Sequence, residues 1–336
     1  TAIPFARLRR ENRALLFSAV KIANVLIIIV SVVFFLLVAP GIYEKSHGWF
    51  RKIYDPGYGV GYVFLANLIG SAATLLILLP FVILKKPVFD RELWKRMMAY
   101  SVPLLITGLS GSVNDTLDKI ILRRMTGEEN GLATVGEYGA GYKIAVLMAL
   151  FIQMFRFAAE PFFFERAKQP DSKQTYASVM KYFIIAMLLI YLGINLYISG
   201  FQFIIGKDFR GAIGVVPIVA MAYLFYGIYI NHSIWYKLND LTRFGIYITL
   251  IGAAITVLIN VLLIPVYGYM ASAWAHVASY GSMILVSFIF AGKRFKVDYN
   301  MKQYIPYFAI AIGMVLFGKY FNYPGIVAEL AVNTAL

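Results

Sequence analysis

Long apolar stretches alternate with short polar connections along the whole chain. A helix needs about 20 mainly apolar residues to cross the hydrocarbon core of a bilayer. Nine stretches are long enough, at 14–39, 60–84, 97–122, 136–166, 176–198, 212–236, 243–264, 268–291 and 303–321. The connections are too short to hold a separate soluble domain. The pattern therefore predicts an all-α fold, a polytopic membrane helix bundle.

Two of the stretches carry further local signals. The fourth is too long for one straight span, and we expect Pro161 to kink it and to leave an amphipathic cytoplasmic tail. In the eighth, Ala271, Ala275 and Ser279 recur every four residues. This spacing favours close contact between two membrane helices.

The composition supports a membrane protein and indicates its orientation. The chain is 60% hydrophobic and 14% charged, with a mean hydropathy of +0.73, whereas soluble domains have about 25% charged residues. Of its 31 Lys and Arg residues, 18 fall in one set of connections, 8 in the other and 5 within stretches. Under the positive-inside rule this split predicts a cytoplasmic start. The net charge of +14 then reflects cytoplasmic loops, and no nucleic-acid partner is indicated.

No metal site or cofactor is expected. The chain has no cysteine, which excludes disulfides, zinc–thiolate clusters and thiol nucleophiles. Its three histidines, His47, His232 and His276, are scattered. We expect each to be hydrogen bonded or solvated and not to be a ligand.

Carboxylates within the third and fourth stretches are candidates for coupling transport to protons or sodium. Asp115 and Asp118 lie one turn apart, and Glu137 and Glu160 follow in the next stretch. Ionisable groups inside a membrane commonly line ion or substrate paths. The alternative for the two aspartates is solvation near the headgroups, or an ion pair with Lys143.

The fourth stretch also carries candidates for substrate binding. Gln153, Arg156 and Glu160 are spaced one turn apart, and Lys143 is expected to extend this polar face. Arginine's planar guanidinium suits bidentate contact with a phosphate or carboxylate. The alternative is an ion pair within the helix that only fixes packing.

The sixth stretch is rich in tyrosine. Tyr223 and Tyr226 lie near its middle, where their rings could stack on sugar faces. Other tyrosines of this stretch fit the aromatic belt at the membrane interface.

Two motifs point to a known superfamily. VGEYGAGYKIA, at 135–145, follows DKIILRRMTG, at 118–127, and a later element at 260–280 reads NVLLIPVYGYMASAWAHVASY. In this order the motifs resemble Wzx-type polysaccharide flippases, which belong to the multidrug, oligosaccharidyl-lipid and polysaccharide exporter superfamily. One departure is Gly268-Tyr269-Met270-Ala271-Ser272-Ala273, where the family more often has Gly-Ile-x-Gly-Ala-Ala.

The resemblance implies a two-lobed bundle of 12–14 helices, of which this chain would be a fragment. Residues 1–96 would hold the last two helices of the first lobe and a cytoplasmic linker, and residues 97–291 the six helices of the second lobe. Residues 292–336 would hold a peripheral helix and the start of another. An even number of helices is expected upstream of the cytoplasmic start.

The resemblance also implies a function. Such flippases move undecaprenyl-pyrophosphate-linked oligosaccharide across the bacterial cell membrane by alternating access, for polysaccharide or lipopolysaccharide (O-antigen) biosynthesis. The partners would be the lipid-linked oligosaccharide, membrane lipids and a coupling proton or sodium ion. Alternatives are a drug/cation antiporter of the same superfamily, a membrane glycan polymerase or ligase, and a scaffold. The enzyme is less favoured because the longest outer connection, 40–59, is short for a catalytic loop.

Overall fold

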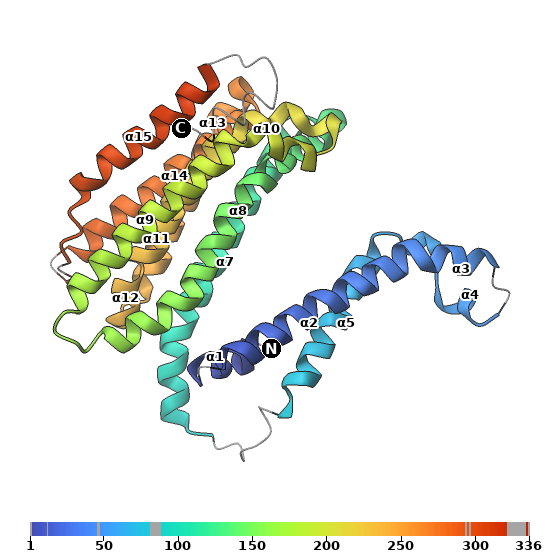
Figure 1. Cartoon of the computed structure of the whole chain (residues 1–336), viewed down its shortest axis with the longest axis horizontal. Helices are drawn as coiled ribbons and strands as arrows, with labels where there is room; N and C mark the ends of the chain where they lie inside the picture. Colours follow the sequence, from blue (N-terminus) through green and yellow to red (C-terminus); the bar gives the residue numbers. More distant parts are fainter. Residues whose placement is uncertain are drawn as a thin grey trace. The chain divides into compact units, whose positions relative to one another are not determined.

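The regular structure of the chain is helical wherever the structure describes it. The computed structural model describes residues 2–11, 13–45, 48–80, 89–292, 294–295, 297–320 and 334, and these ranges contain no strand (Figure 1). Within them, eight helical segments are long and apolar enough to cross a membrane. The all-α membrane bundle expected from the sequence is thus confirmed. The chain divides into two compact units, Thr1–Asp90 and Arg91–Leu336.

The first unit is built on a pair of long helices. Its elements are α1 (Ala2–Arg10), α2 (Ala14–Val33), the π-helical η1 (Phe34–Val38), α3 (Ala39–Lys45), α4 (Phe50–Ile53), the 3₁₀ helix η2 (Pro56–Tyr58) and α5 (Gly61–Leu78). Helices α2 and α5 pack together, and Asn24 Nδ2 donates to Thr74 Oγ1 over 2.8 Å between them. This bond satisfies polar side chains inside an otherwise apolar pair.

The first apolar stretch runs further than expected. Its helix was expected to end at Ala39, but helical structure continues from Ala14 to Lys45, through Pro40. Proline within an α-helix lacks an N–H and clashes with the carbonyl four residues earlier. The wider π-helical turns of η1 end at Val38, two residues before Pro40, and a π-bulge alters the spacing between the proline ring and that carbonyl. The expected end at 39 is therefore wrong, because the helix accommodates Pro40.

The second unit is a bundle of long helices joined by short ones. Its elements are α7 (Arg91–Met125), α8 (Glu128–Arg166), α9 (Ser172–Leu196), α10 (Ile198–Phe201), η3 (Gln202–Ile204), η4 (Lys207–Val215), α11 (Val216–His232), α12 (Ile234–Leu238), α13 (Arg243–Tyr267), α14 (Tyr269–Ala291), η5 (Met301–Tyr304) and α15 (Ile305–Tyr320). Helix α11 is central, since it packs against α8, α9 and α14, while α15 lies along α9 (Figure 1).

Several boundaries in this unit differ from those expected. Helix α7 begins at Arg91, before the expected 97, and it is not among the eight apolar segments. Helix α8 begins at Glu128, before the expected 136, but ends at Arg166 as expected and is α-helical through Pro161. Helix α13 likewise passes Pro265, where a tight loop was expected, and the turn to α14 consists of Gly268 with φ +56°. Glycine adopts this left-handed conformation without steric cost.

The small residues spaced four apart on α14 lie at a close contact between helices, as their spacing predicted. Ala271, Ala275 and Ser279 are all buried, and α13 packs against this helix. Ser279 Oγ donates to the carbonyl oxygen of Gly252 over 2.9 Å. The close contact between α13 and α14 is therefore confirmed.

Candidate functional site

A cavity of about 550 Å³ lies within the second unit, lined by residues of α7, α8, α11, α12, α13 and α14. This volume is within the usual range for ligand pockets, about 300–1,000 Å³. We call it the tyrosine cavity, because its lining includes Tyr100, Tyr226, Tyr229, Tyr236 and Tyr280.

Three charged side chains meet in the wall of the tyrosine cavity. Glu160 Oε1 accepts from Lys237 Nζ over 2.6 Å and from Arg156 Nε over 3.1 Å. The side chain of Lys237 is 12% exposed, that of Glu160 29% and that of Arg156 48%. A single carboxylate therefore holds two cations, and the cluster carries a net charge of +1.

The exposed member of this cluster has hydrogen-bonding capacity to spare. A guanidinium carries five N–H donors, and Arg156 uses one of them on Glu160. Its remaining donors make no hydrogen bond to any described residue. Arg156 and Glu160 lie four residues apart on α8, so the helix itself fixes their proximity. The cluster can therefore offer a positioned guanidinium to an anionic group.

The tyrosines give the same cavity aromatic and hydroxyl surface. The hydroxyls of Tyr229 and Tyr236 are 3.2 Å apart, and both residues are buried. The rings of Tyr226 and Tyr280 lie 4.9 Å apart between their centroids. Aromatic faces combined with hydroxyl groups suit a ligand that has both apolar faces and polar edges.

A second polar group of side chains is buried deeper in this unit. Asp118 Oδ2 lies 3.0 Å from His276 Nε2, and Asp118 Oδ1 lies 3.3 Å from Lys119 Nζ. The Lys119 ammonium stands 4.2 Å from the ring centroid of Tyr142, whose hydroxyl accepts from that of Tyr223 over 2.7 Å. This network joins α7, α8, α11 and α14, and both Asp118 and His276 are almost fully buried.

The tyrosine cavity brings together only part of the expected substrate site. Arg156, Glu160 and Tyr226 all line it, whereas Gln153 is exposed on α8 outside its lining. Tyr223 belongs to the buried network. Lys143 lines a different cavity, so it does not extend the polar face of Arg156 as expected.

The expected coupling carboxylates are likewise dispersed. Asp118 lies in the buried network and pairs with His276 and Lys119, not with Lys143. Glu137 is half-buried beside Gly211, where a Cβ atom would collide with its carboxylate. The side chain of Asp115 lies outside the described part of the structure, as does His47.

Sequence reasoning missed two residues that complete these clusters. Lys237 falls just after the sixth apolar stretch, in a connection, yet it pairs with Glu160, which is 77 positions away. His276 is hydrogen bonded, one of the two states expected for it, but its partner Asp118 lies 158 positions away and was not predicted. Helical spacing cannot signal either pair, because the partners lie on different helices.

Part of the chain matches a known protein family. Residues 5–167 match the family model described as "Polysaccharide biosynthesis protein", a little under half of the 336 residues. Over these residues, which include the motifs at 118–127 and 135–145, the expected resemblance to proteins of polysaccharide biosynthesis is confirmed. A comparison with curated proteins gave no match.

Solved transporters share the fold. The structure titled "Crystal structure of MATE in the straight conformation" matches with a TM-score of 0.67 at 14% identity, over 87% of this chain and 65% of that one. The "Lipid II flippase MurJ, inward closed conformation" matches with a TM-score of 0.64 at 14% identity, over 99% of this chain and 68% of that one. The chain therefore spans about two thirds of the length of these structures and has their helical membrane fold.

Proposed function

We propose that this chain is part of a flippase for undecaprenyl-pyrophosphate-linked oligosaccharide in the bacterial cell membrane. It would work by alternating access, in polysaccharide or lipopolysaccharide (O-antigen) biosynthesis. The observation that carries the proposal is the net positive cluster of Arg156, Glu160 and Lys237 in the wall of a tyrosine-rich cavity. The family match over residues 5–167 supports the same pathway.

The cluster suits a pyrophosphate group. A guanidinium binds phosphate oxygens bidentately, and a lysine ammonium adds a point charge. An incoming pyrophosphate would compete with Glu160 for Arg156 and Lys237, so that both cations keep a partner throughout binding and release. This exchange avoids leaving a buried charge unpaired at either stage.

The aromatic part of the cavity suits the glycan. Tyr226 is half-buried in the lining and near Tyr280, so part of its ring faces the cavity. A sugar presents C–H faces to such a ring and hydroxyl groups to neighbouring polar atoms. The prenyl tail needs no polar site and would remain in lipid. In this proposal the chain moves its substrate unchanged and is not an enzyme.

Glu160 and Asp118 are the carboxylates best suited to ion coupling. Protonation of Glu160 would remove the anion that holds Arg156 and Lys237 together, and would free both for an anionic substrate. Asp118 is fully buried and faces His276, so a proton gained there would change the charge of the helix contact between α7 and α14. The coupling ion would be a proton or sodium.

The main rival is a drug/cation antiporter, which the fold shared with MATE also favours. An antiporter for organic cations would use Glu160 to attract its substrate, whereas a pyrophosphate site would use Arg156 and Lys237. The two functions therefore predict ligands of opposite charge for the same cavity.

A binding measurement on the purified full-length protein separates these two functions. We expect farnesyl pyrophosphate, a soluble stand-in for the lipid carrier, to bind, and tetraphenylphosphonium, an organic cation, not to compete. Lys237→Gln should weaken farnesyl pyrophosphate about tenfold or more, the effect of losing a charge-assisted hydrogen bond. Lys181→Gln is the matched control, because Lys181 is a lysine of α9 outside the cavity lining. Binding of the phosphonium but not of the pyrophosphate would contradict the proposal.

A further inference from the structure

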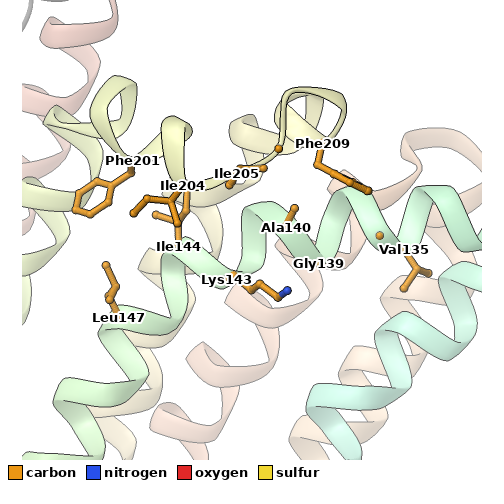
Figure 2. Close-up of a pocket in the computed structure, with 12 residues that line it drawn as sticks. Val135, Gly139, Ala140, Lys143, Ile144, Leu147, Phe201, Ile204, Ile205 and Phe209 are labelled. Carbon is orange, nitrogen blue, oxygen red and sulfur yellow. The ribbon is translucent and has the colours of Figure 1, made fainter. Parts of the chain in front are cut away.

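A second cavity of the same unit is a groove of about 540 Å³. One wall is the face of α8 that carries Gly136, Ala140, Lys143 and Leu147, spaced three or four residues apart. The other wall is the segment 201–209, which includes η3 (Figure 2). We call this the Lys143 groove. It shares no lining residue with the tyrosine cavity.

The lining of the Lys143 groove is apolar with a single exception. Its side chains come from valine, alanine, isoleucine, leucine and phenylalanine, and Lys143 is the one charged residue among them. Lys143 is exposed and forms no ion pair with any described residue. Figure 2 shows the Lys143 side chain leaving α8 near Gly139 and Ala140, while Ile204, Ile205 and Phe209 come from the opposite wall. An ammonium in such a wall needs an anionic partner or water.

Close backbone packing holds the two walls together. A Cβ atom at Gly141 would lie 2.5 Å from the carbonyl oxygen of Ala212, so only glycine allows η4 to approach α8 this closely. Arg210 Nε donates to the carbonyl oxygen of Ile205 over 3.4 Å, and its guanidinium stands 5.4 Å from the ring centroid of Phe203. The 201–209 segment is therefore tied to η4, and η4 to α8.

The Lys143 groove lies at one end of two apolar spans. Segment 201–209 follows the apolar span Ser172–Leu196 and runs into the start of the next one, Lys207–Leu238, so it lies at the ends of both. On the groove's rim Ile204 is 79% exposed and Phe209 43% exposed. The groove thus opens onto an apolar surface, with Lys207, Asp208 and Arg210 of η4 beside it and Glu137 of α8 next to Gly211.

We propose that the Lys143 groove binds an anionic glycerophospholipid, with an acyl chain along its apolar walls and the phosphodiester on Lys143. The charge of the site identifies the class of headgroup. A phosphodiester carries one negative charge, which matches the one charged residue of the lining, Lys143, whereas a pyrophosphate would place further negative charge against apolar walls, since Lys207 and Arg210 lie outside the lining. A zwitterionic headgroup would bring its own ammonium close to Lys143. The apolar walls then contribute van der Waals contacts to the acyl chain.

Native mass spectrometry of the delipidated full-length protein tests this assignment. Phosphatidylglycerol is the anionic probe, phosphatidylethanolamine the zwitterionic probe of similar size, and undecaprenyl phosphate the prenyl probe. We expect the protein to retain phosphatidylglycerol, and Lys143→Gln to weaken it about tenfold or more. Ala140→Phe, which fills the groove without changing charge, should also reduce retention, whereas Lys143→Arg should preserve it. Lys181→Gln is the control for loss of a lysine elsewhere in a span.

Retention of each lipid by the wild type and the variants decides whether the Lys143 groove is the binding site. Loss of phosphatidylglycerol in both Lys143→Gln and Ala140→Phe, with retention in Lys181→Gln, would establish the site. Equal retention of phosphatidylglycerol and phosphatidylethanolamine would overturn the headgroup assignment. Preferential retention of undecaprenyl phosphate would also overturn it. Unchanged retention in both groove variants would show that bound lipid lies elsewhere on the protein.

Discussion

Arg156→Ala is expected to reduce transport of the lipid-linked oligosaccharide at least tenfold and to leave the amount of protein in the membrane unchanged. The guanidinium is the cation of the cluster most open to the tyrosine cavity, with its side chain 48% exposed. Losing a charge-assisted contact to a phosphate costs about 1.5–3 kcal/mol, or roughly 10- to 150-fold in affinity. Exposed ion pairs add about 0–1 kcal/mol to stability, so folding should change little.

The comparison for this variant is Arg166→Ala. Arg166 lies at the end of the same helix, 40% exposed, and pairs with Asp171 at 3.8 Å. The Arg166→Ala variant therefore loses an arginine and an ion pair, and no residue of the cavity lining changes. Transport in membrane vesicles, together with immunoblots of membrane abundance, measures both properties. Arg156→Ala with wild-type transport would remove Arg156 from the substrate site.

Asp118→Ala, unlike Arg156→Ala, is expected to cause a large loss of folded protein. Asp118 is 0% exposed and holds both His276, at 3.0 Å, and Lys119, at 3.3 Å. Removing one partner of a buried ion pair costs about 3–5 kcal/mol, because the remaining charge is left uncompensated. The melting temperature of the purified protein and its membrane abundance should both fall sharply. Asp118→Asn, which keeps a hydrogen-bonding oxygen, should lose less.

Asp171→Ala is the matched control for this second prediction. Asp171 is 57% exposed at the start of α9, so its loss should cost about 0–1 kcal/mol. If Asp118→Ala were as stable as wild type but inactive in transport, the network would have a coupling role and no structural one. If it were both stable and active, the account of this network would be wrong.

The sequence predicts which segments form long helices, but it does not predict where those helices begin and end. Each of the nine apolar stretches corresponds to a long helical segment in the described part of the chain, because burial in lipid demands such stretches. The expected ends at 39 and 264 each stand directly before a proline, Pro40 and Pro265, and both helices continue past it. In a membrane, neighbouring helices and π-helical turns can accommodate the missing hydrogen bond.

The candidate site was predictable only where it lay on one helix. The pair of Arg156 and Glu160 follows from four-residue spacing on α8, whereas Lys237 reaches Glu160 across the bundle. The expected shared face of Lys143 and Arg156 fails on helix geometry alone. Thirteen residues at 3.6 per turn set them about 140° apart around the axis and about 20 Å apart along it. The structure accordingly puts them in different cavities.

The most direct test of the account is to deplete the full-length protein in its host and measure lipid-linked oligosaccharide by mass spectrometry. Its accessibility to reagents confined outside the cell membrane is measured in the same cells. We predict that a completed glycan lipid accumulates, that it is inaccessible from outside, and that the wild-type gene but not Arg156→Ala reverses this. Normal amounts with normal exposure would contradict the account and favour drug export. Exposed but unpolymerised units would contradict it in favour of a polymerase or ligase.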